Sequence, residues 1–252
     1  MSVRRYRAVV AYDGTNYFGF QRQESGHTPT IQGALEDALR SVTGQVITVV
    51  GAGRTDTGVH ATGQVIAWDV EWRHSADDLL RALNANLPRD IALQTIAEAR
   101  AEFHPRFDAQ SRTYQYQIYN APVRHPLYER TAWHIGRPLD LAAMQAAARH
   151  LIGEHDFAAF GQPPQGSNTV RVVRRATWER DGARYTFTIE ANAFLQRMVR
   201  SIVGTMVEVG GGALSPDAFA DILAAADRGR AGATAPPQGL CLVSVQYGEQ
   251  GT

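Results

Sequence analysis

The chain has 252 residues, of which 44% are hydrophobic and 20% charged. That length allows one large domain or two modest ones, and it is enough to bury a core without disulfides or metals. The ordinary balance of residue types excludes a disordered, collagen-like or tail-like protein. The single cysteine, Cys241, excludes an internal disulfide and a cysteine-based zinc cluster, so a reducing cytosol is expected.

The charges balance, with 25 basic and 25 acidic residues. This excludes a histone-like protein but permits a local basic cleft. The chain contains no lysine, so every basic residue is an arginine, which can make bidentate contacts to phosphate and stack on bases. The basic N-terminus precedes too few apolar residues for a signal sequence, and no stretch approaches the roughly 20 apolar residues of a membrane helix. We therefore expect a soluble, cytoplasmic protein.

The first half of the chain predicts alternating strands and helices. Strand patterns cover residues 5–12, 64–72 and 91–96, and residues 46–50 are typical of a short buried strand. Helical spacing covers residues 31–42, with Thr28 and Pro29 as a start signal. A capping-box pattern at Ser75 and Asp78 begins a second helix, and Pro88 lies beyond its end. The predicted order is β-α-β-β-α-β.

The second half predicts the same order. Residues 112–119 and 240–247 alternate as strands, and residues 170–178 and 184–190 indicate a hairpin around Asp181 and Gly182. One helix follows Asp140, another covers residues 194–208, and Ser215 with Pro216 caps a third. We predict an α+β fold of two ferredoxin-like β-α-β-β-α-β units. The expected halves are residues 1–104 and 105–252.

Four connections are longer than hairpins need: residues 19–30, 51–63, 120–137 and 226–239. Long loops in compact domains are commonly functional or mobile. Residues 51–63 join two apolar strands and carry Arg54, Asp56 and His60 among glycines and threonines. An aspartate there could be a nucleophile, a metal ligand or simply a turn former, which is its commonest role.

Several other functions do not fit this loop. It lacks the Lys-Ser/Thr ending of a Walker A motif, and its glycine spacing does not match the dinucleotide fingerprint. His60 has no partner at metal-ligand spacing, which favours a hydrogen-bonded loop histidine. A zinc deaminase is excluded by the single cysteine, and a hydrolase elbow is absent.

Two further segments carry candidate residues. Arg112, Tyr114 and Tyr116 share one face of a predicted strand, which is either a half-buried aromatic face or a platform for stacking and proton transfer. In the helix from Phe194, an apolar stripe predicts burial, and Arg200 lies off that stripe. Helical periodicity alone favours a solvated arginine at that position.

The loop closely resembles a known catalytic motif. Residues 53–61, with the sequence GRTDTGVHA, are similar to the motif of the tRNA pseudouridine synthase A family. Further blocks resemble that family in the same order. They are YDGT at 12–15, YFGFQ at 17–21, TIQGALE at 30–36, LNANLP at 83–88, FHPRF at 103–107, RTYQY at 112–116, FLQRMVR at 194–200 and TAPPQGL at 234–240.

The resemblance implies isomerisation of uridine to pseudouridine at positions 38, 39 and 40 of tRNA. It implies that Asp56 is the catalytic aspartate, that Tyr114 stacks on the uracil, and that Arg200 pairs with the aspartate. Arg54 would help to hold the flipped nucleotide, and Leu240 would line the uracil pocket, with Leu242 as the neighbouring alternative. The family also implies a mainly antiparallel sheet, an active-site cleft between the two units and a homodimer.

The reaction adds and removes no group, so no cofactor or metal is expected. Candidates for the rim of an arginine-lined groove are Arg22, Arg54 and Arg106. Two alternatives stay open: a tRNA-binding chaperone of the same fold that catalyses nothing, and a metal-dependent phosphodiesterase using Asp56. The sequence lacks the carboxylate cluster that a metal-dependent phosphodiesterase would need. The RNA contacts of residues 120–137 and 161–168 are not predicted.

Overall fold

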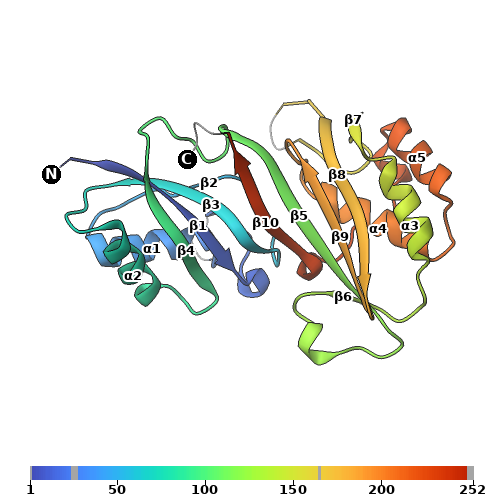
Figure 1. Cartoon of the computed structure of the whole chain (residues 1–252), viewed down its shortest axis with the longest axis horizontal. Coiled ribbons are helices and arrows are strands. Elements are labelled where there is room, and N and C mark those ends of the chain that lie inside the picture. The colour runs from blue at the N-terminus through green and yellow to red at the C-terminus, as the bar shows by residue number, and fades with distance from the viewer. Residues whose placement is uncertain (1, 24–27, 164–165, 249–252) are drawn as a thin grey trace. The chain divides into compact units, whose positions relative to one another are not determined.

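The computed structural model describes residues 2–23, 28–163 and 166–248, so parts of the segments 19–30 and 161–168 lie outside the described residues. The chain divides into two compact units (Figure 1). The first contains the chain up to Gln110 together with the segment from Leu242 onward, and the second is Ser111–Cys241. The last strand therefore groups with the first unit, whereas the sequence grouped it with the second half.

The first unit has the predicted order β-α-β-β-α-β. Its elements are β1 (Arg4–Tyr12), a 3-10 turn (Gly14–Asn16), α1 (Ile31–Thr43), β2 (Val50–Gly51), β3 (His60–Val70), α2 (Ala76–Asn86) and β4 (Ile91–Ala99), with β10 (Leu240–Tyr247) returning at the end. The strands lie in the order β4-β1-β3-β10, and β2 pairs with β3. The pairs of β1 with β3 and with β4 are antiparallel.

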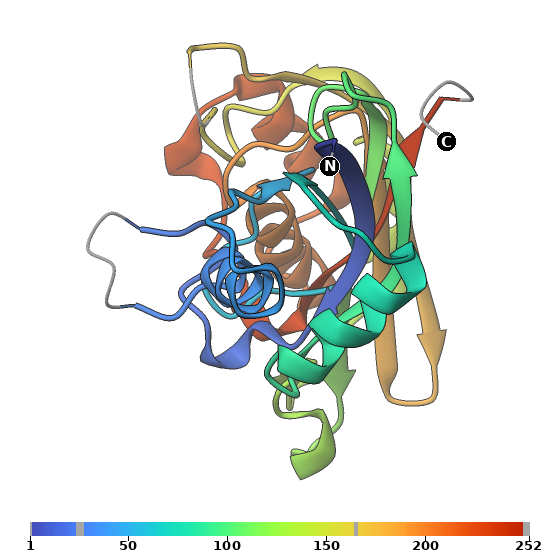
Figure 2. The same ribbon diagram turned by 90° about the vertical axis from the view of Figure 1, so that its left-hand side faces the viewer.

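The helices α1 and α2 pack against each other, and Figure 2 shows them beside the strands. The Thr30 side chain caps α1 by accepting from the backbone N–H of Gly33. Thr30 directly follows Thr28 and Pro29, the predicted start signal. The predicted capping box of Ser75 and Asp78 is confirmed. Apolar side chains from both helices, β3 and β4 line one internal space: Leu35, Ala38, Leu39, Ile66, Trp68, Leu83, Leu87 and Leu93.

One predicted strand of the first unit, residues 46–50, is wrong in its bounds, because β2 covers only Val50–Gly51. Residues 46–50 do not form a buried strand, because Val46 is 92% exposed and only Val50–Gly51 pairs with β3. Ile47 and Val49 are buried. The apolar residues of this run therefore pack into the core from a connecting segment that forms no strand hydrogen bonds before Val50. The strand predicted from Gln64 begins earlier, at His60.

The second unit contains β5 (Ala109–Asn120), β6 (Trp133–Ile135), α3 (Leu141–Arg149), β7 (Gly153–Asp156), β8 (Val170–Asp181), β9 (Arg184–Ala191), α4 (Met198–Gly210) and α5 (Pro216–Ala225). Short 3-10 turns lie at Pro126–Tyr128, Arg228–Arg230 and Pro237–Gly239. The strands lie in the order β5-β9-β8-β7 with antiparallel pairs, and β6 pairs parallel to β5. The α+β class and the mainly antiparallel pairing are confirmed. The second unit adds β6 and β7 to its predicted order.

The helix predicted from Phe194 begins only at Met198. Gln196 is held in a bridge with Gln162, its N–H donating to the Gln162 carbonyl at 2.9 Å, and Arg197 has a left-handed φ of 63°. This backbone cannot continue a right-handed helix. The predicted apolar stripe of α4 is buried. Among the described residues, no helix is both long and apolar enough to cross a membrane.

Candidate active site

The loop between β2 and β3 carries Asp56 in the first unit. Asp56 is partly exposed, Thr55 before it is buried, and Arg54 is exposed. The Asp56 carbonyl accepts from the backbone N–H of Val59 at 3.1 Å, and Gly58 has a φ of 76°. The aspartate therefore begins a tight turn, whose left-handed position is one that glycine adopts without strain. Its backbone position alone is compatible with either a turn former or a nucleophile.

The end of β1 and the segment that follows it hold this loop on both sides of Asp56. The hydroxyl groups of Tyr12 and Thr55 lie 2.8 Å apart in a buried contact. The Phe20 N–H donates to the Thr55 carbonyl at 3.0 Å, and the Gly58 N–H donates to the Tyr17 carbonyl at 3.3 Å. Gln64 adds a side-chain hydrogen bond to the Gly53 carbonyl at 2.7 Å. These bonds fix the backbone around the aspartate.

Two glycines allow the close approach between these segments. A Cβ on Gly14 would lie 2.0 Å from the Val59 carbonyl oxygen. A Cβ on Gly19, whose φ is 91°, would lie 2.7 Å from the Thr55 carbonyl oxygen. Real Cβ atoms do not come so near to backbone oxygens, so any other residue would push the two segments apart.

His60 stands at the start of β3 and is buried. Its Nδ1 accepts from the Gly14 N–H at 3.0 Å and lies 3.1 Å from Oδ1 of Asp13. The predicted hydrogen-bonded loop histidine is confirmed. Within residues 2–23, 28–163 and 166–248, the structure shows no cluster of three histidine, cysteine, aspartate or glutamate residues able to hold a metal ion.

In the second unit, β5 presents the predicted face of Arg112, Tyr114 and Tyr116, and all three are buried. Arg112 donates to the Asn192 carbonyl at 2.9 Å. The Tyr114 ring is 8% exposed and packs edge-on against Phe194, with ring centroids 5.0 Å apart. The face is thus buried, and packing against Phe194 fixes the orientation of the Tyr114 ring.

Arg200 is held in the first turn of α4. Its Nε donates to the Ala235 carbonyl at 2.8 Å, and the Ala235 N–H donates back to the Arg200 carbonyl at 3.0 Å. Arg200 is partly exposed and its Nε is held by the protein, so it is not the fully solvated arginine that helical periodicity alone favours. Burial raises the pKa of Tyr116 well above its usual range, and the nearby Arg200 charge opposes that rise.

Residues 235–240 bring Arg200, Tyr116 and Leu240 into one region of the second unit. The Tyr116 hydroxyl donates to the Pro236 carbonyl at 2.8 Å, and a Cβ on Gly239 would lie 2.6 Å from the Tyr116 ring. Leu240 follows directly and is buried, as is Leu242. Tyr114, Arg200 and Leu240 thus belong to the second unit, and Arg54 and Asp56 belong to the first.

A sequence model of the family described as tRNA pseudouridine synthase matches residues 8–108 and 147–248. This chain belongs to the tRNA pseudouridine synthase family. A tRNA pseudouridine synthase A from Geotalea uraniireducens is 44% identical over 97% of this chain and 100% of its own length. Proteins of the same name from Brevibacillus brevis and Caulobacter vibrioides are 46% and 43% identical, each over 97% of this chain and over 100% and 99% of their own lengths.

Among solved structures, the archaeal box H/ACA sRNP Nop10–Cbf5 complex matches over 81% of this chain and 44% of that chain. The identity is 11% and the TM-score is 0.38.

Sequence reasoning missed how the first segment of this synthase-family chain contributes. In the sequence, Tyr12, Gly14 and Gly19 stand out only as part of the blocks that match the family. In the structure, they contact the Asp56 loop at Thr55 and Val59. The signal that could have revealed this is the presence of two glycines within the segment YDGTNYFGF, since closely spaced glycines often mark an approach of one backbone to another.

Proposed function

We propose that this chain isomerises uridine to pseudouridine in the anticodon stem-loop of tRNAs, at positions 38, 39 and 40, with Asp56 as the nucleophile. Membership of the tRNA pseudouridine synthase family supports the reaction and the tRNA substrate. The observation that most supports the role of Asp56 is its loop, in which hydrogen bonds hold the chain on both sides of a partly exposed aspartate.

The reaction breaks the N1–C1′ glycosidic bond, turns the uracil and joins it again through C5. The C5 proton is lost and N1 gains a proton, so the base changes no oxidation state and needs no redox cofactor. A carboxylate can attack the base or the sugar, or it can remove a sugar proton, and all three uses are open to Asp56. Each needs the ionised form of the carboxylate.

The second unit supplies the other proposed roles. Tyr114 would stack on the uracil and transfer the C5 proton, and its burial against Phe194 favours a fixed ring orientation. Arg200 would pair with Asp56 and favour its ionised form, because an opposite charge stabilises a carboxylate. Leu240 would line the uracil pocket.

The target uridine must leave its stack before it can react. Unstacking costs about a few kcal/mol, which stacking on Tyr114 and contacts from Arg54 would offset. The exposure of Arg54 on the same loop as Asp56 is consistent with a contact to the backbone of the flipped nucleotide.

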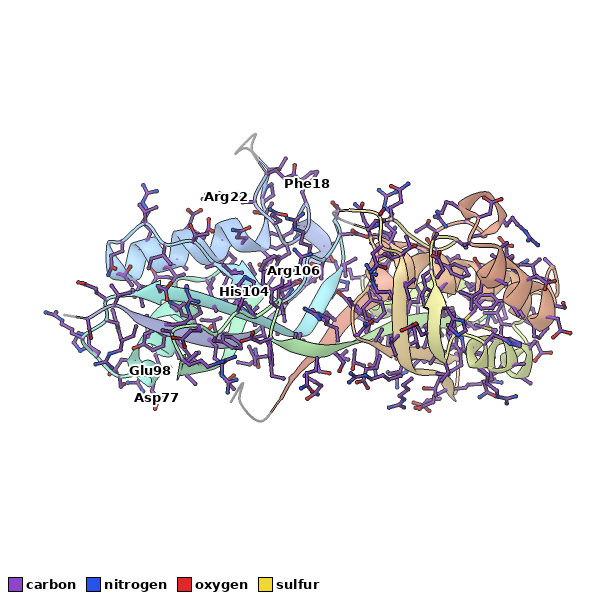
Figure 3. All side chains as sticks on the ribbon, turned by 90° about the horizontal axis from the view of Figure 1, so that it is seen from above. Phe18, Arg22, Asp77, Glu98, His104 and Arg106 are labelled. Atoms are coloured by element: carbon purple, nitrogen blue, oxygen red, sulfur yellow. The ribbon has the colours of Figure 1, made fainter. Side chains whose placement is uncertain are left out.

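A chain with balanced charge needs its arginines gathered on one surface in order to bind RNA. We propose a cytoplasmic homodimer with an arginine-lined groove leading to Asp56. Figure 3 shows Arg22 on one side of the first unit and Asp77 and Glu98 on the opposite side, with Arg106 between them. Arg22 already pairs with Glu36 at 2.9 Å and Asp37 at 3.6 Å, so part of its charge is balanced within the first unit.

The direct test is to map pseudouridine in tRNA from cells with and without this protein. We expect positions 38, 39 and 40 to lose pseudouridine when the gene is removed and to regain it when the gene is returned. Unchanged modification at those positions would contradict the proposed substrate. Loss elsewhere in tRNA would keep the reaction and change the site.

A further inference from the structure

The turn that follows β4 is fixed to the body of the first unit at several points. Phe103 is buried in an apolar cluster with Ala52, Val65 and Ala67. The Pro105 carbonyl accepts from the Tyr247 hydroxyl at 2.7 Å. Such anchoring holds the residues between these points in one conformation.

A carboxylate closes the same turn. Asp108 accepts from Arg100 at 2.6 Å and from the His104 N–H at 3.1 Å, and its own N–H donates to the His104 carbonyl at 3.0 Å. The charge of Asp108 is therefore balanced by Arg100 within the turn.

This fixed turn presents an aromatic side chain to solvent. Phe107 is 75% exposed, which makes it one of the more exposed large apolar side chains among the described residues. The His104 ring packs on it with centroids 4.2 Å apart, and the Arg106 guanidinium carbon lies 5.7 Å from its ring centroid. His104 Nδ1 also accepts from the N–H groups of Arg106 and Phe107, both at 3.2 Å. Figure 3 shows His104 and Arg106 within the first unit.

A single exposed apolar side chain is common on protein surfaces and by itself needs no explanation. Phe107 differs because two polar side chains pack against its ring, the imidazole of His104 and the guanidinium of Arg106. An aromatic ring beside an arginine is the combination that binds unpaired nucleotides, since the ring stacks on a base while the guanidinium meets a phosphate.

We infer that Phe107 is a stacking site for an unpaired RNA base other than the reacting uridine, with Arg106 contacting the phosphate of that nucleotide. The inference rests on the proposed function only in taking tRNA as the RNA that is bound. The partner is RNA rather than protein because one exposed ring offers far less apolar area than a stable protein interface needs, whereas one ring is enough to stack on one base.

The position of the turn within the first unit supports the same partner. Phe103, at the start of the turn, packs with Ala52, which lies two residues before Arg54 on the Asp56 loop. An RNA held at that loop would therefore have further nucleotides near the turn. Stacking there would hold the RNA on the protein without touching the reacting base.

The experiment measures binding of an unmodified tRNA transcript to Phe107→Ala, Phe107→Tyr and the control Val46→Ala. Val46 is an exposed apolar residue of the same unit, so its loss tests the effect of removing exposed apolar surface alone. We expect the Kd to rise by about tenfold, and up to about a hundredfold, for Phe107→Ala. Phe107→Tyr keeps the ring and should bind like the original protein, as should Val46→Ala.

A second measurement reports stacking itself. An RNA hairpin that contains no uridine in its stem or loop carries 2-aminopurine at one loop position at a time, so no isomerisation can occur. Stacking on an aromatic ring should quench its fluorescence at one position with the original protein and with Phe107→Tyr, but not with Phe107→Ala. Thermal unfolding confirms that the exposed substitution leaves the fold intact.

Unchanged affinity for Phe107→Ala, together with quenching retained at the position that the original protein quenches, would overturn the inference. A change in the solution mass of Phe107→Ala would instead assign this surface to contact with a second copy of the chain, which also overturns it. Failure of the isomerase proposal looks different, because RNA binding that depends on Phe107 would persist in a protein that makes no pseudouridine.

Discussion

The hydroxyl group of Tyr12 lies 2.8 Å from the hydroxyl group of Thr55, the residue immediately before Asp56. Both side chains are buried, so the pair links the end of β1 to the loop that carries the carboxylate. A buried hydrogen bond of this kind fixes position more than it adds net stability, because water would satisfy both groups in the unfolded chain.

Tyr12→Phe should lower kcat by about tenfold with little change in KM, since a slightly misplaced Asp56 affects the reaction more than tRNA binding. It should also reduce the free energy of unfolding by about 1–3 kcal/mol, because the Thr55 hydroxyl loses a buried partner. The matched double variant, Tyr12→Phe with Thr55→Val, removes both polar groups and should recover part of that stability. Chemical denaturation and steady-state kinetics measure these effects, and an unaltered kcat for Tyr12→Phe would remove the positioning role.

Tyr114→Phe keeps the stacking ring and loses the hydroxyl. If that hydroxyl moves the C5 proton, the chemical step should slow by roughly 10²–10⁴-fold while tRNA binding stays the same. Single-turnover kinetics measures the step. A native rate would leave Tyr114 with a stacking role alone.

Tyr116→Phe is the matched control on the same face of β5. Its hydroxyl donates to the Pro236 carbonyl, and its raised pKa keeps it protonated at physiological pH. Its loss should reduce stability by about 1 kcal/mol and change the chemical step by only a few-fold. An equally large loss of rate in both variants would argue for a shared structural effect.

Local signals predicted much of this fold because their causes are local. The capping box at Ser75 and Asp78 and the hairpin around Gly182 depend on residues only a few positions apart. The start of α4 could not be predicted, because Gln196 is held by Gln162 from another part of the chain. The short strands β6 and β7 have three and four residues, too few to show a period.

The candidate site divides in the same way. The Asp56 loop is recognisable from its own residues, whereas the Tyr12–Thr55 contact joins positions 43 residues apart. Helical periodicity alone favours a solvated Arg200, because the residues of one helix do not reveal that the Ala235 carbonyl accepts a hydrogen bond from its side chain. How Asp56 meets Tyr114 and Arg200 stays a prediction.

Arginines of the proposed groove should differ in their effect on RNA binding. Arg54→Gln and Arg106→Gln should each reduce the slope of log Kd against log salt by about 0.7, the value for one single-strand phosphate contact. Arg22→Gln should change it less, because Glu36 and Asp37 already neutralise that charge. Binding titrations at several salt concentrations, with the solution mass, test this, and salt-independent binding or a fully active monomer would refute it.

Removal of metal ions should leave the protein active. The proposed chemistry uses a carboxylate, a phenol and a guanidinium, none of which needs a metal to act. Enzyme treated with EDTA and dialysed should isomerise refolded tRNA at the rate of untreated enzyme, with magnesium added equally to both for the RNA. Isomerisation that is lost and then restored only by another divalent cation would contradict this metal-free chemistry.

The central claim is that Asp56 carries out the isomerisation, and release of tritium from tRNA labelled at uridine C5 measures that reaction directly. The original protein should release the label, because C5 loses its hydrogen when it joins C1′. Asp56→Asn should release none while binding tRNA with nearly the original affinity, because the amide keeps the shape of the side chain and loses the nucleophile. Appreciable release by an Asp56→Asn preparation free of deamidated protein would contradict the account.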